Sequence, residues 1–274
     1  MLKLIKMDFY RLFSSKAIKV GLIVAAAVSA LYMLLSLGLV EIIRIIIRDD
    51  PMGVDGMSVF LPHIAWVNKI DFFGIVLNGV SAFSLFIGCM ITANFIGTEQ
   101  SCGYTKNFAG QLPNRGYMAI SKFLVTSVAQ LMVLVVYTIV SSVCTLLLLS
   151  KCISGYNELG GFLEALGLKA LMYLAINAII VFICTLSRSH AVGMVVGSIF
   201  GIGVTKLIYP ILGSLLSSIK INFNIGDYMP DGVDGMISTT IPGDLLLRGV
   251  LVGVGFIVAF VAANYFVVKI RDVK

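Results

Sequence analysis

Long apolar runs constrain this chain more than any other feature. Runs of about 20 mostly apolar residues, the length that an α-helix needs to cross a bilayer, recur along most of the sequence. Fifty-nine per cent of the 274 residues are hydrophobic, 12 per cent are charged and the mean hydropathy is +1.02, far from the balance of a soluble domain. The sequence therefore predicts an all-α integral membrane protein, with one transmembrane domain over residues 1–274 and no room for a separate soluble catalytic domain.

Six segments are predicted to be transmembrane helices. The first could be mistaken for a cleaved signal, but its apolar run continues unbroken from Val20 to Val40, which is too long for a signal core. An even number of spans places both termini on the same side of the membrane. The predicted spans are residues 20–43, 72–96, 118–149, 162–186, 191–213 and 246–268.

The basic residues are distributed by membrane side. Most lysines and arginines fall on the side of the termini, whereas the acids gather in the loops of the other side. Because Lys and Arg accumulate in cytoplasmic loops, both termini are predicted to be cytoplasmic. This topology accounts for the net charge of +6 without a nucleic-acid partner. The basic segments are residues 1–19, residues 97–122, Arg188 and the residues after 268.

The first residues form an amphipathic pattern. Residues 2–16 place large apolar side chains near one helical face and Lys3, Lys6 and Arg11 largely off it. A short helix in the cytoplasmic headgroup layer fits this pattern, and a simple basic anchor fits it equally well. The apolar face consists of Leu2, Ile5, Phe9, Leu12 and Phe13.

Two predicted outer loops share the pentapeptide Gly-Val-Asp-Gly-Met, in residues 51–62 and 230–242. Asp-Gly forms turns, so two solvent-exposed turns are expected, and a pair of outer gate or lid turns is the alternative. The short apolar segment 210–223, which starts at Pro210, is predicted to be an interfacial or re-entrant piece rather than a span.

No catalytic constellation is found in the sequence, so the chain is not expected to be an enzyme or to bind a cofactor or metal. The stretch GTEQSCGYTK, from Gly97 to Lys106, lacks the GxxxxGK[ST] spacing that a phosphate loop needs. His63 and His190 lie on opposite predicted sides. The cysteines have no CxxC spacing and are predicted to be small buried hydrophobes. They are Cys89, Cys102, Cys144, Cys152 and Cys184.

Several polar residues fall inside predicted spans, where they are costly and therefore functional candidates. They could face a translocation path, or they could make hydrogen bonds that only pack the helices. Lys206, Lys169 and Arg248 are expected to extend toward the outer interface on their long side chains. Glycines at 193, 197, 201 and 203 permit close helix packing. The candidate substrate-path residues are Asn78, Asn94, Gln130, Asn177 and Asn264.

The hydrophilic stretch between the second and third spans carries a further pattern. An acid is followed by glycine, threonine and lysine, then by an arginine and a lysine before the next span. Together with a basic interfacial helix and six spans, this pattern resembles the type-2 ABC transporter permeases over nearly the whole chain. The family's usual Gly-Thr is replaced here by Gly103-Tyr104-Thr105. The matching residues are Glu99, Gly103, Thr105, Lys106, Asn107, Arg115 and Lys122.

The resemblance implies that this stretch forms a cytoplasmic coupling helix that docks onto a separate ATPase. The coupling residues would be Glu99, Gly103, Tyr104, Thr105, Lys106, Asn107 and Arg115. It also implies a bacterial cell membrane protein that works as an exporter with two ATPase subunits, which use ATP and Mg, and with a second permease copy or sister permease. Antimicrobial peptides such as lantibiotics, or hydrophobic drugs, are the expected substrates. The alternative is an ATP-independent carrier or a structural membrane bundle.

Overall fold

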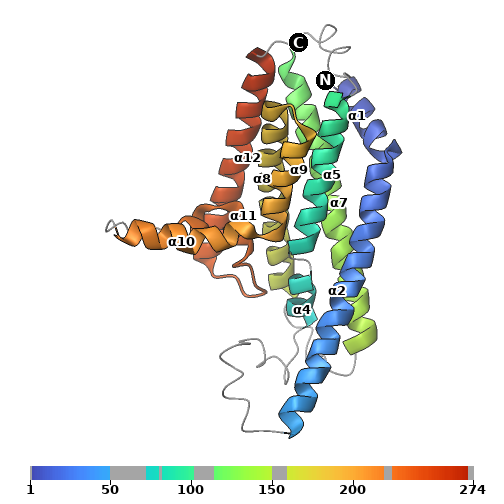
Figure 1. The fold of residues 1–274 in the computed structure, drawn as a ribbon, viewed down its shortest axis with the longest axis vertical. Coiled ribbons are helices and arrows are strands. Elements are labelled where there is room, and N and C mark those ends of the chain that lie inside the picture. The colour runs from blue at the N-terminus through green and yellow to red at the C-terminus, as the bar shows by residue number, and fades with distance from the viewer. Residues whose placement is uncertain are drawn as a thin grey trace.

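The computed structural model describes residues 2–49, 72–79, 82–101, 114–149, 159–218 and 224–270. These residues form ten α-helices and one 3-10 helix, which confirms the all-α prediction (Figure 1). The helices are α1 (Leu2–Ser14), α2 (Lys16–Asp49), α4 (Phe72–Gly79), α5 (Ala82–Ser101), α7 (Gly116–Leu149), α8 (Leu159–Ser187), α9 (His190–Ile202), α10 (Val204–Ser218), α11 (Pro230–Asp234) and α12 (Gly243–Ile270), with the 3-10 helix η3 (Ile225–Tyr228).

Four helices among the described residues are long and apolar enough to cross a membrane, namely α2, α7, α8 and α12. They coincide with four of the predicted spans. A fifth candidate is the bent pair α9 and α10, if it counts as one span. The remaining predicted span, residues 72–96, divides between α4 and α5. The chain is therefore a multi-pass membrane protein, and the count of six spans stays a prediction.

The predicted fifth span is not one straight helix. Helices α9 and α10 meet at 73°, and α10 extends sideways from the bundle (Figure 1). The break falls at Gly203, whose φ of +81° is the left-handed conformation that glycine adopts at little cost. Its N–H bonds back to the carbonyls of Ile199 and Phe200, which closes α9. The interfacial or re-entrant segment predicted over residues 210–223 stays a prediction, but its start at Pro210 is not a helix start, because this proline lies inside α10.

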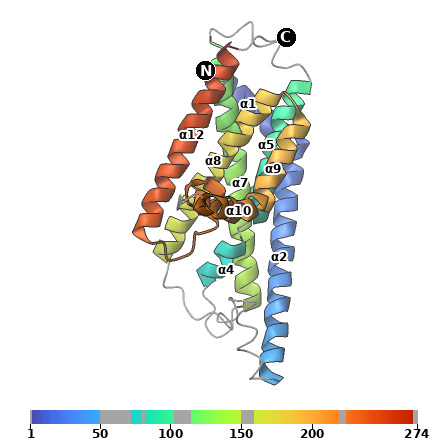
Figure 2. The same ribbon diagram turned by 60° about the vertical axis from the view of Figure 1, so that its left-hand side comes forward.

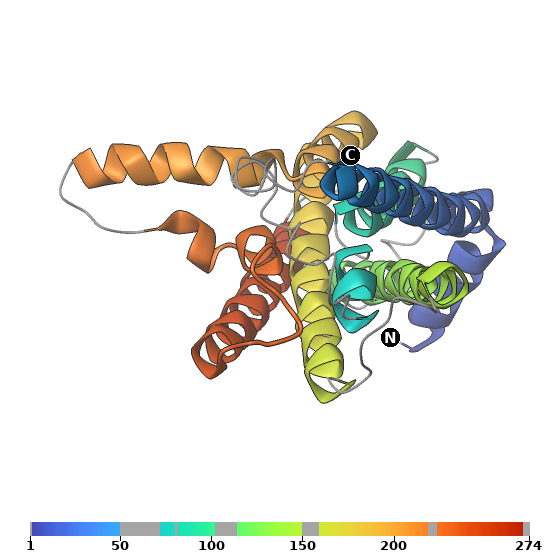
Figure 3. The ribbon, with the colours of Figure 1, turned by 90° about the horizontal axis from the view of Figure 1, so that it is seen from below.

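Helix α8 is the centre of the bundle. Viewed along the bundle, it lies between α12 on one side and α7 and α2 on the other (Figure 3). Its side chains Met172, Tyr173, Ile176 and Ile180 are fully buried. Fourteen of its residues are buried, more than a lipid-facing helix would show, so α8 organises the core that the other spans cover.

Helices α5 and α9 pack closely through the glycines that the sequence indicated. A Cβ at Gly201 would lie 2.4 Å from the Cα of Phe86, and one at Gly197 would lie 3.2 Å from the Cβ of Cys89. This contact confirms the packing role of the glycine stripe, here within one chain. The thiols of Cys89 and Cys184 are buried beside it, as predicted.

The two described ends of the chain lie at the same end of the bundle. Helix α1, the turn at Arg188 and the last turn of α12 gather there, whereas α4 lies toward the opposite end (Figures 1 and 2). Helices α2 and α7 are the longest, at 34 residues each, which corresponds to about 50 Å. They pack along each other, and Ser29 hydrogen-bonds Ser141 at 3.1 Å between them.

Candidate functional site

A buried carboxylate joins three helices at the end of the bundle that carries α1. The Oε2 of Glu99 on α5 accepts from Arg11 of α1 at 3.0 Å, and its Oε1 lies 3.0 Å from the ammonium of Lys122 on α7. The Glu99 side chain is only 1% exposed, and that of Arg11 is 28% exposed. A carboxylate this deep is tolerated because two cations neutralise it. We call these three residues the Glu99 cluster.

A second carboxyl reinforces the attachment of α1. The Oγ of Ser121 on α7 donates to Asp8 Oδ2 at 2.6 Å, and Asp8 is buried. Burial raises the pKa of the Asp8 carboxyl above its usual value of 3.8. The guanidinium of Arg11 also lies 4.5 Å from the centre of the Phe95 ring, a cation–π contact. Helix α1 is therefore fixed to α5 and α7 by directed polar contacts as well as by apolar packing.

The predicted coupling residues are only partly within the described chain. Glu99 lies on the last turns of α5, and Arg115 is half-buried in the turn before α7. Residues 103–107, which hold Gly103, Tyr104, Thr105, Lys106 and Asn107, lie outside the described residues. The structure thus locates the two ends of the loop: Glu99 binds Arg11 of α1, whereas Asn114, next to Arg115, donates to the Tyr265 hydroxyl of α12.

Asp8 was not among the predicted site residues, and Arg11 was predicted only to lie largely off the apolar face of the first helix. A signal was present, because Asp8 is the only acid among residues 1–19 and lies four residues from both Leu4 and Leu12. Residues spaced by four share a helical face, and Leu4, Asp8 and Leu12 are the buried stripe of α1. Phe13, which was expected on the apolar face, is exposed instead.

A second ion cluster lies among α8, α10 and α11. Lys169 donates to Asp234 Oδ1 at 2.9 Å, and the ammonium of Lys206 lies 3.5 Å from Asp234 Oδ2. The side chains of Lys169 and Asp234 are 3% and 2% exposed, and that of Lys206 is 36% exposed. We call these residues the Asp234 cluster. The prediction that Lys169 extends toward solvent was wrong, because the chain supplies a buried carboxylate; Lys206 also points to this carboxylate.

The second Gly-Val-Asp-Gly-Met segment is only partly an exposed turn. Gly235 and Met236 form an exposed turn as predicted, but Gly232, Val233 and Asp234 are buried in α11, so the expected exposure was wrong for these three residues. Asp231, one residue earlier, accepts hydrogen bonds from Thr205 and Tyr209 of α10. The five-residue helix α11 can be buried because its acids have partners on α8 and α10. The first copy, in residues 51–62, lies outside the described residues.

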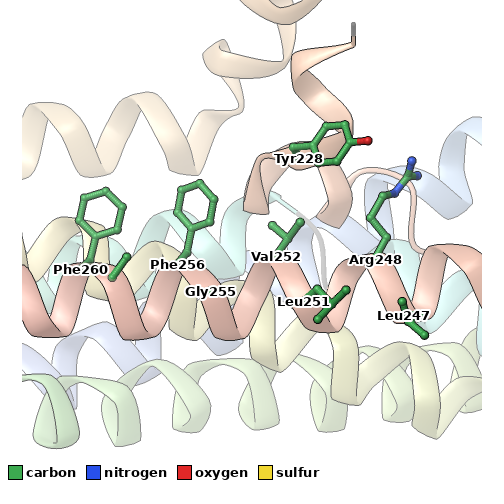
Figure 4. A pocket seen from close by; sticks show the side chains of 9 residues that line it. Tyr228, Leu247, Arg248, Leu251, Val252, Gly255, Phe256 and Phe260 are labelled. Carbon is green, nitrogen blue, oxygen red and sulfur yellow. The ribbon is translucent and has the colours of Figure 1, made fainter.

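Arg248 on α12 borders a surface groove. It was expected to extend toward the interface, and its Nη1 lies 3.4 Å from Asp227 Oδ2 of η3. The groove has a volume of about 610 Å³ and follows α12 from Leu247 to Phe260 (Figure 4). Its wall is almost entirely apolar, with Arg248 and Tyr228 at one end.

The predicted substrate-path residues have different surroundings. Asn177 packs the bundle: its Oδ1 accepts from Thr92, and its Nδ2 donates to Thr126 and Ser127. Asn94 lines a separate groove of about 500 Å³ between α2 and α5, together with Lys16. The structure does not bring the five residues into one path. Of the others, Gln130 and Asn264 are buried with side-chain atoms that have no hydrogen-bond partner among the described residues, and Asn78 lies on α4.

The described residues contain no group of three or more His, Cys, Asp or Glu side chains that could hold a metal ion. Two buried carboxylates, Glu99 and Asp234, each hold helices from separate parts of the chain. No family model matches the chain, and no curated protein matches it.

Proposed function

We propose that this chain is the membrane-spanning permease subunit of an ATP-driven ABC exporter. In this proposal, two cytoplasmic ATPase subunits bind the stretch from Glu99 to Arg115, and a second permease copy or sister permease completes the transporter. The substrate is an amphipathic or hydrophobic molecule, such as an antimicrobial peptide or a drug. The bundle contributes six spans and a coupling helix between the second and third of them.

The Glu99 cluster is the observation that carries the proposal. A coupling segment transmits motion only if its ends are rigidly attached to the helices that must move. Glu99 is the first residue of the stretch that resembles a coupling helix, and Lys122 lies after this stretch, in the second turn of α7. Both are tied to Arg11 of α1 through one carboxylate. A push on the stretch would therefore reach α1, α5 and α7 together.

The energetic cost of separating this cluster supports movement as a unit. Removing one partner of a buried ion pair costs about 3–5 kcal/mol, because the other charge is left without compensation. Glu99 and Lys122 are both buried, so they are expected to stay together through a conformational cycle. Rigid-body motion of the three helices between inward-open and outward-open packings fits this constraint.

Purification of the tagged chain from its native membrane tests the proposal. We expect a cytoplasmic protein with a complete GxxxxGK[ST] motif to co-purify, and its ATPase activity to depend on the chain. Lys106→Glu should abolish this association because it reverses a charge in the middle of the docking stretch. Glu99→Gln should leave the ATPase attached but reduce its stimulation, since α1 is then no longer held to α5 by charge.

Lys269→Glu is the matched control, because Lys269 is exposed on α12 at the same end of the bundle. It makes the same charge change outside the docking stretch, and we expect normal association. The proposal fails if no protein with the ATPase motif co-purifies. It also fails if Lys106→Glu and Lys269→Glu bind the ATPase equally well.

A second candidate, an ATP-independent carrier, is favoured by one observation. Ion-driven carriers place a carboxylate inside the bundle, and Asp234 is buried against Lys169 of α8. For such a carrier, the purified chain in vesicles would move its substrate down an ion gradient without any ATPase, and Asp234→Asn would stop this movement. The ABC exporter requires ATP and the partner subunit for every cycle, which separates the two.

A further inference from the structure

The groove along α12 has one polar end and a long apolar wall. Leu251, Val252, Phe256 and Phe260 line it in helical register, and the small Gly255 leaves a trough between them (Figure 4). A Cβ at Gly255 would meet nothing within 4 Å, so the trough is open. Leu247 and Leu251 are highly exposed, as expected for a helix that faces lipid.

The polar end presents both signs of charge. Arg248 Nη1 contacts Asp227 Oδ2 at 3.4 Å, longer than the 2.7–2.9 Å that is typical of a charge-assisted hydrogen bond. The Nε of Arg248 is buried with no hydrogen-bond partner among the described residues. The contact with Asp227 is therefore long, and the partly exposed guanidinium keeps donor capacity for a second acceptor. Asp227 is itself partly exposed and accepts from Asn224 at 3.0 Å.

The dimensions of the groove match one leaflet of a bilayer. Arg248 and Phe260 are twelve residues apart on α12, which corresponds to about 18 Å of helix. Half of the hydrocarbon core is about 15 Å thick. A molecule with its charged group at Arg248 and an acyl chain along the trough would therefore lie in a single leaflet. The charge distribution of the sequence predicts that this is the outer one.

We propose that this groove binds one phospholipid whose headgroup carries both a phosphate and an ammonium, as in phosphatidylethanolamine. The phosphate accepts from Arg248, the ammonium lies at Asp227, and one acyl chain fills the trough over Gly255 and Ala259. A guanidinium holds phosphate oxygens through two parallel hydrogen bonds, and Asp227 complements a cation but repels an anion. The proposal does not depend on whether the chain works with an ATPase.

Native mass spectrometry of the full-length chain tests the site. The delipidated protein is titrated separately with dioleoyl-phosphatidylethanolamine, -phosphatidylglycerol and -phosphatidylcholine. We expect one phosphatidylethanolamine per chain, with weaker binding of phosphatidylglycerol, which has no ammonium. Arg248→Ala should lower the affinity about tenfold, which is the usual effect of losing a hydrogen bond to a charged group. The affinity of Arg248→Lys should lie between those of the wild type and Arg248→Ala, because a lysine ammonium is a compact charge without the planar fork that binds phosphate through two hydrogen bonds.

A Cβ at Gly255 meets nothing within 4 Å, so we expect Gly255→Leu to fill the open trough and to lower phosphatidylethanolamine binding while the protein stays folded. Gly167→Leu is the control, since Gly167 lies on α8 with the same open surroundings. Asp227→Asn should remove the preference for phosphatidylethanolamine over phosphatidylglycerol. Equal binding by Gly255→Leu and Gly167→Leu, or an unchanged preference in Asp227→Asn, would overturn the proposal.

A second copy of the chain is the competing occupant of this face. Ala259 is exposed in the groove, so Ala259→Cys would form disulfide-linked dimers in native membranes if two copies met there. The chain without the added cysteine is the control. If Ala259→Cys forms more disulfide-linked dimers than this control, the proposed lipid site is also overturned.

Discussion

The Asp234 cluster makes the sharpest stability prediction. Asp234 and Lys169 are buried and 2.9 Å apart, so Asp234→Asn leaves an uncompensated ammonium inside the bundle. The free energy of unfolding should fall by about 3–5 kcal/mol. Lys206→Met should cost less than about 1 kcal/mol, because Lys206 is partly exposed and lies farther from the carboxylate. The asymmetry between the two lysines follows from their burial and from their distances to Asp234.

Equilibrium unfolding of the purified chain in detergent micelles measures these changes. Lys169→Met should also be strongly destabilising, since Asp234 would keep only the looser contact with Lys206. The double variant Asp234→Asn/Lys169→Met removes both charges, so it should lose at least about 1 kcal/mol less than the sum of the single variants. Apolar replacement of a whole buried pair is often well tolerated.

Glu164→Gln provides the matched control for loss of one acid on the same helix bundle. Glu164 is exposed on α8, so this change should alter the stability by no more than about 0.5 kcal/mol. The reasoning is refuted if Asp234→Asn and Glu164→Gln have the same effect. Strict additivity in the double variant would refute it as well, because it would mean that Lys169 and Asp234 do not interact.

Two further variants test the packing and the attachment of α1. Gly201→Ala should lower the free energy of unfolding by about 1–3 kcal/mol, because the added Cβ would strike the backbone of Phe86. Gly213→Ala is the control, since a Cβ at Gly213 meets nothing within 4 Å and should have no such cost. Equilibrium unfolding in micelles compares the two variants. The raised pKa of Asp8 means that the folded chain holds this proton more tightly than the unfolded chain does, so its contribution to stability is lost as the pH rises above 3.8. Asp8→Asn keeps an acceptor for Ser121 but removes the charge. The free energy of unfolding of this variant, relative to the wild type, should therefore increase from pH 4 upward by about 1 kcal/mol or less. A decrease of this relative free energy over the same pH range would contradict the role of burial.

The sequence was sufficient for the membrane class and for most helix positions. Runs of apolar residues predict spans whatever the partners of each helix are, so the helices at 16–49, 116–149, 159–187 and 243–270 followed directly. The close packing of α5 and α9 could also be predicted, because glycine at intervals of four leaves a groove on any helix.

The bend at Gly203 and the buried acids could not be predicted in the same way. A glycine inside an apolar run is compatible with a straight helix, and only the tertiary structure selects its left-handed conformation. Asp234 was interpreted as part of a turn because Asp-Gly usually forms one. Its burial depends on Lys169, which is 65 residues away in sequence. Long-range charge compensation of this kind leaves no local pattern.

The same distinction applies to the Glu99 cluster. Glu99 and Lys122 were identified from a local motif, whereas Arg11 is 88 residues from Glu99 and joined the site only through the fold. The buried position of Asp8 could have been inferred from its spacing on α1, since it shares a helical face with Leu4 and Leu12. A charged residue on an apolar stripe predicts a partner even when the partner cannot be named.

The great length of α2 and α7 has a consequence for molecules that approach the membrane. The hydrocarbon core is about 30 Å thick, and a helix of 34 residues is about 50 Å long, so the packed pair exceeds the core by about 20 Å. A typical tilt of about 20° shortens this excess only slightly. At the end opposite α1, α2 and α7 extend beyond the other described helices (Figure 2). The two helices form a stalk, and a large molecule diffusing toward that surface meets its tip before it meets the lipid.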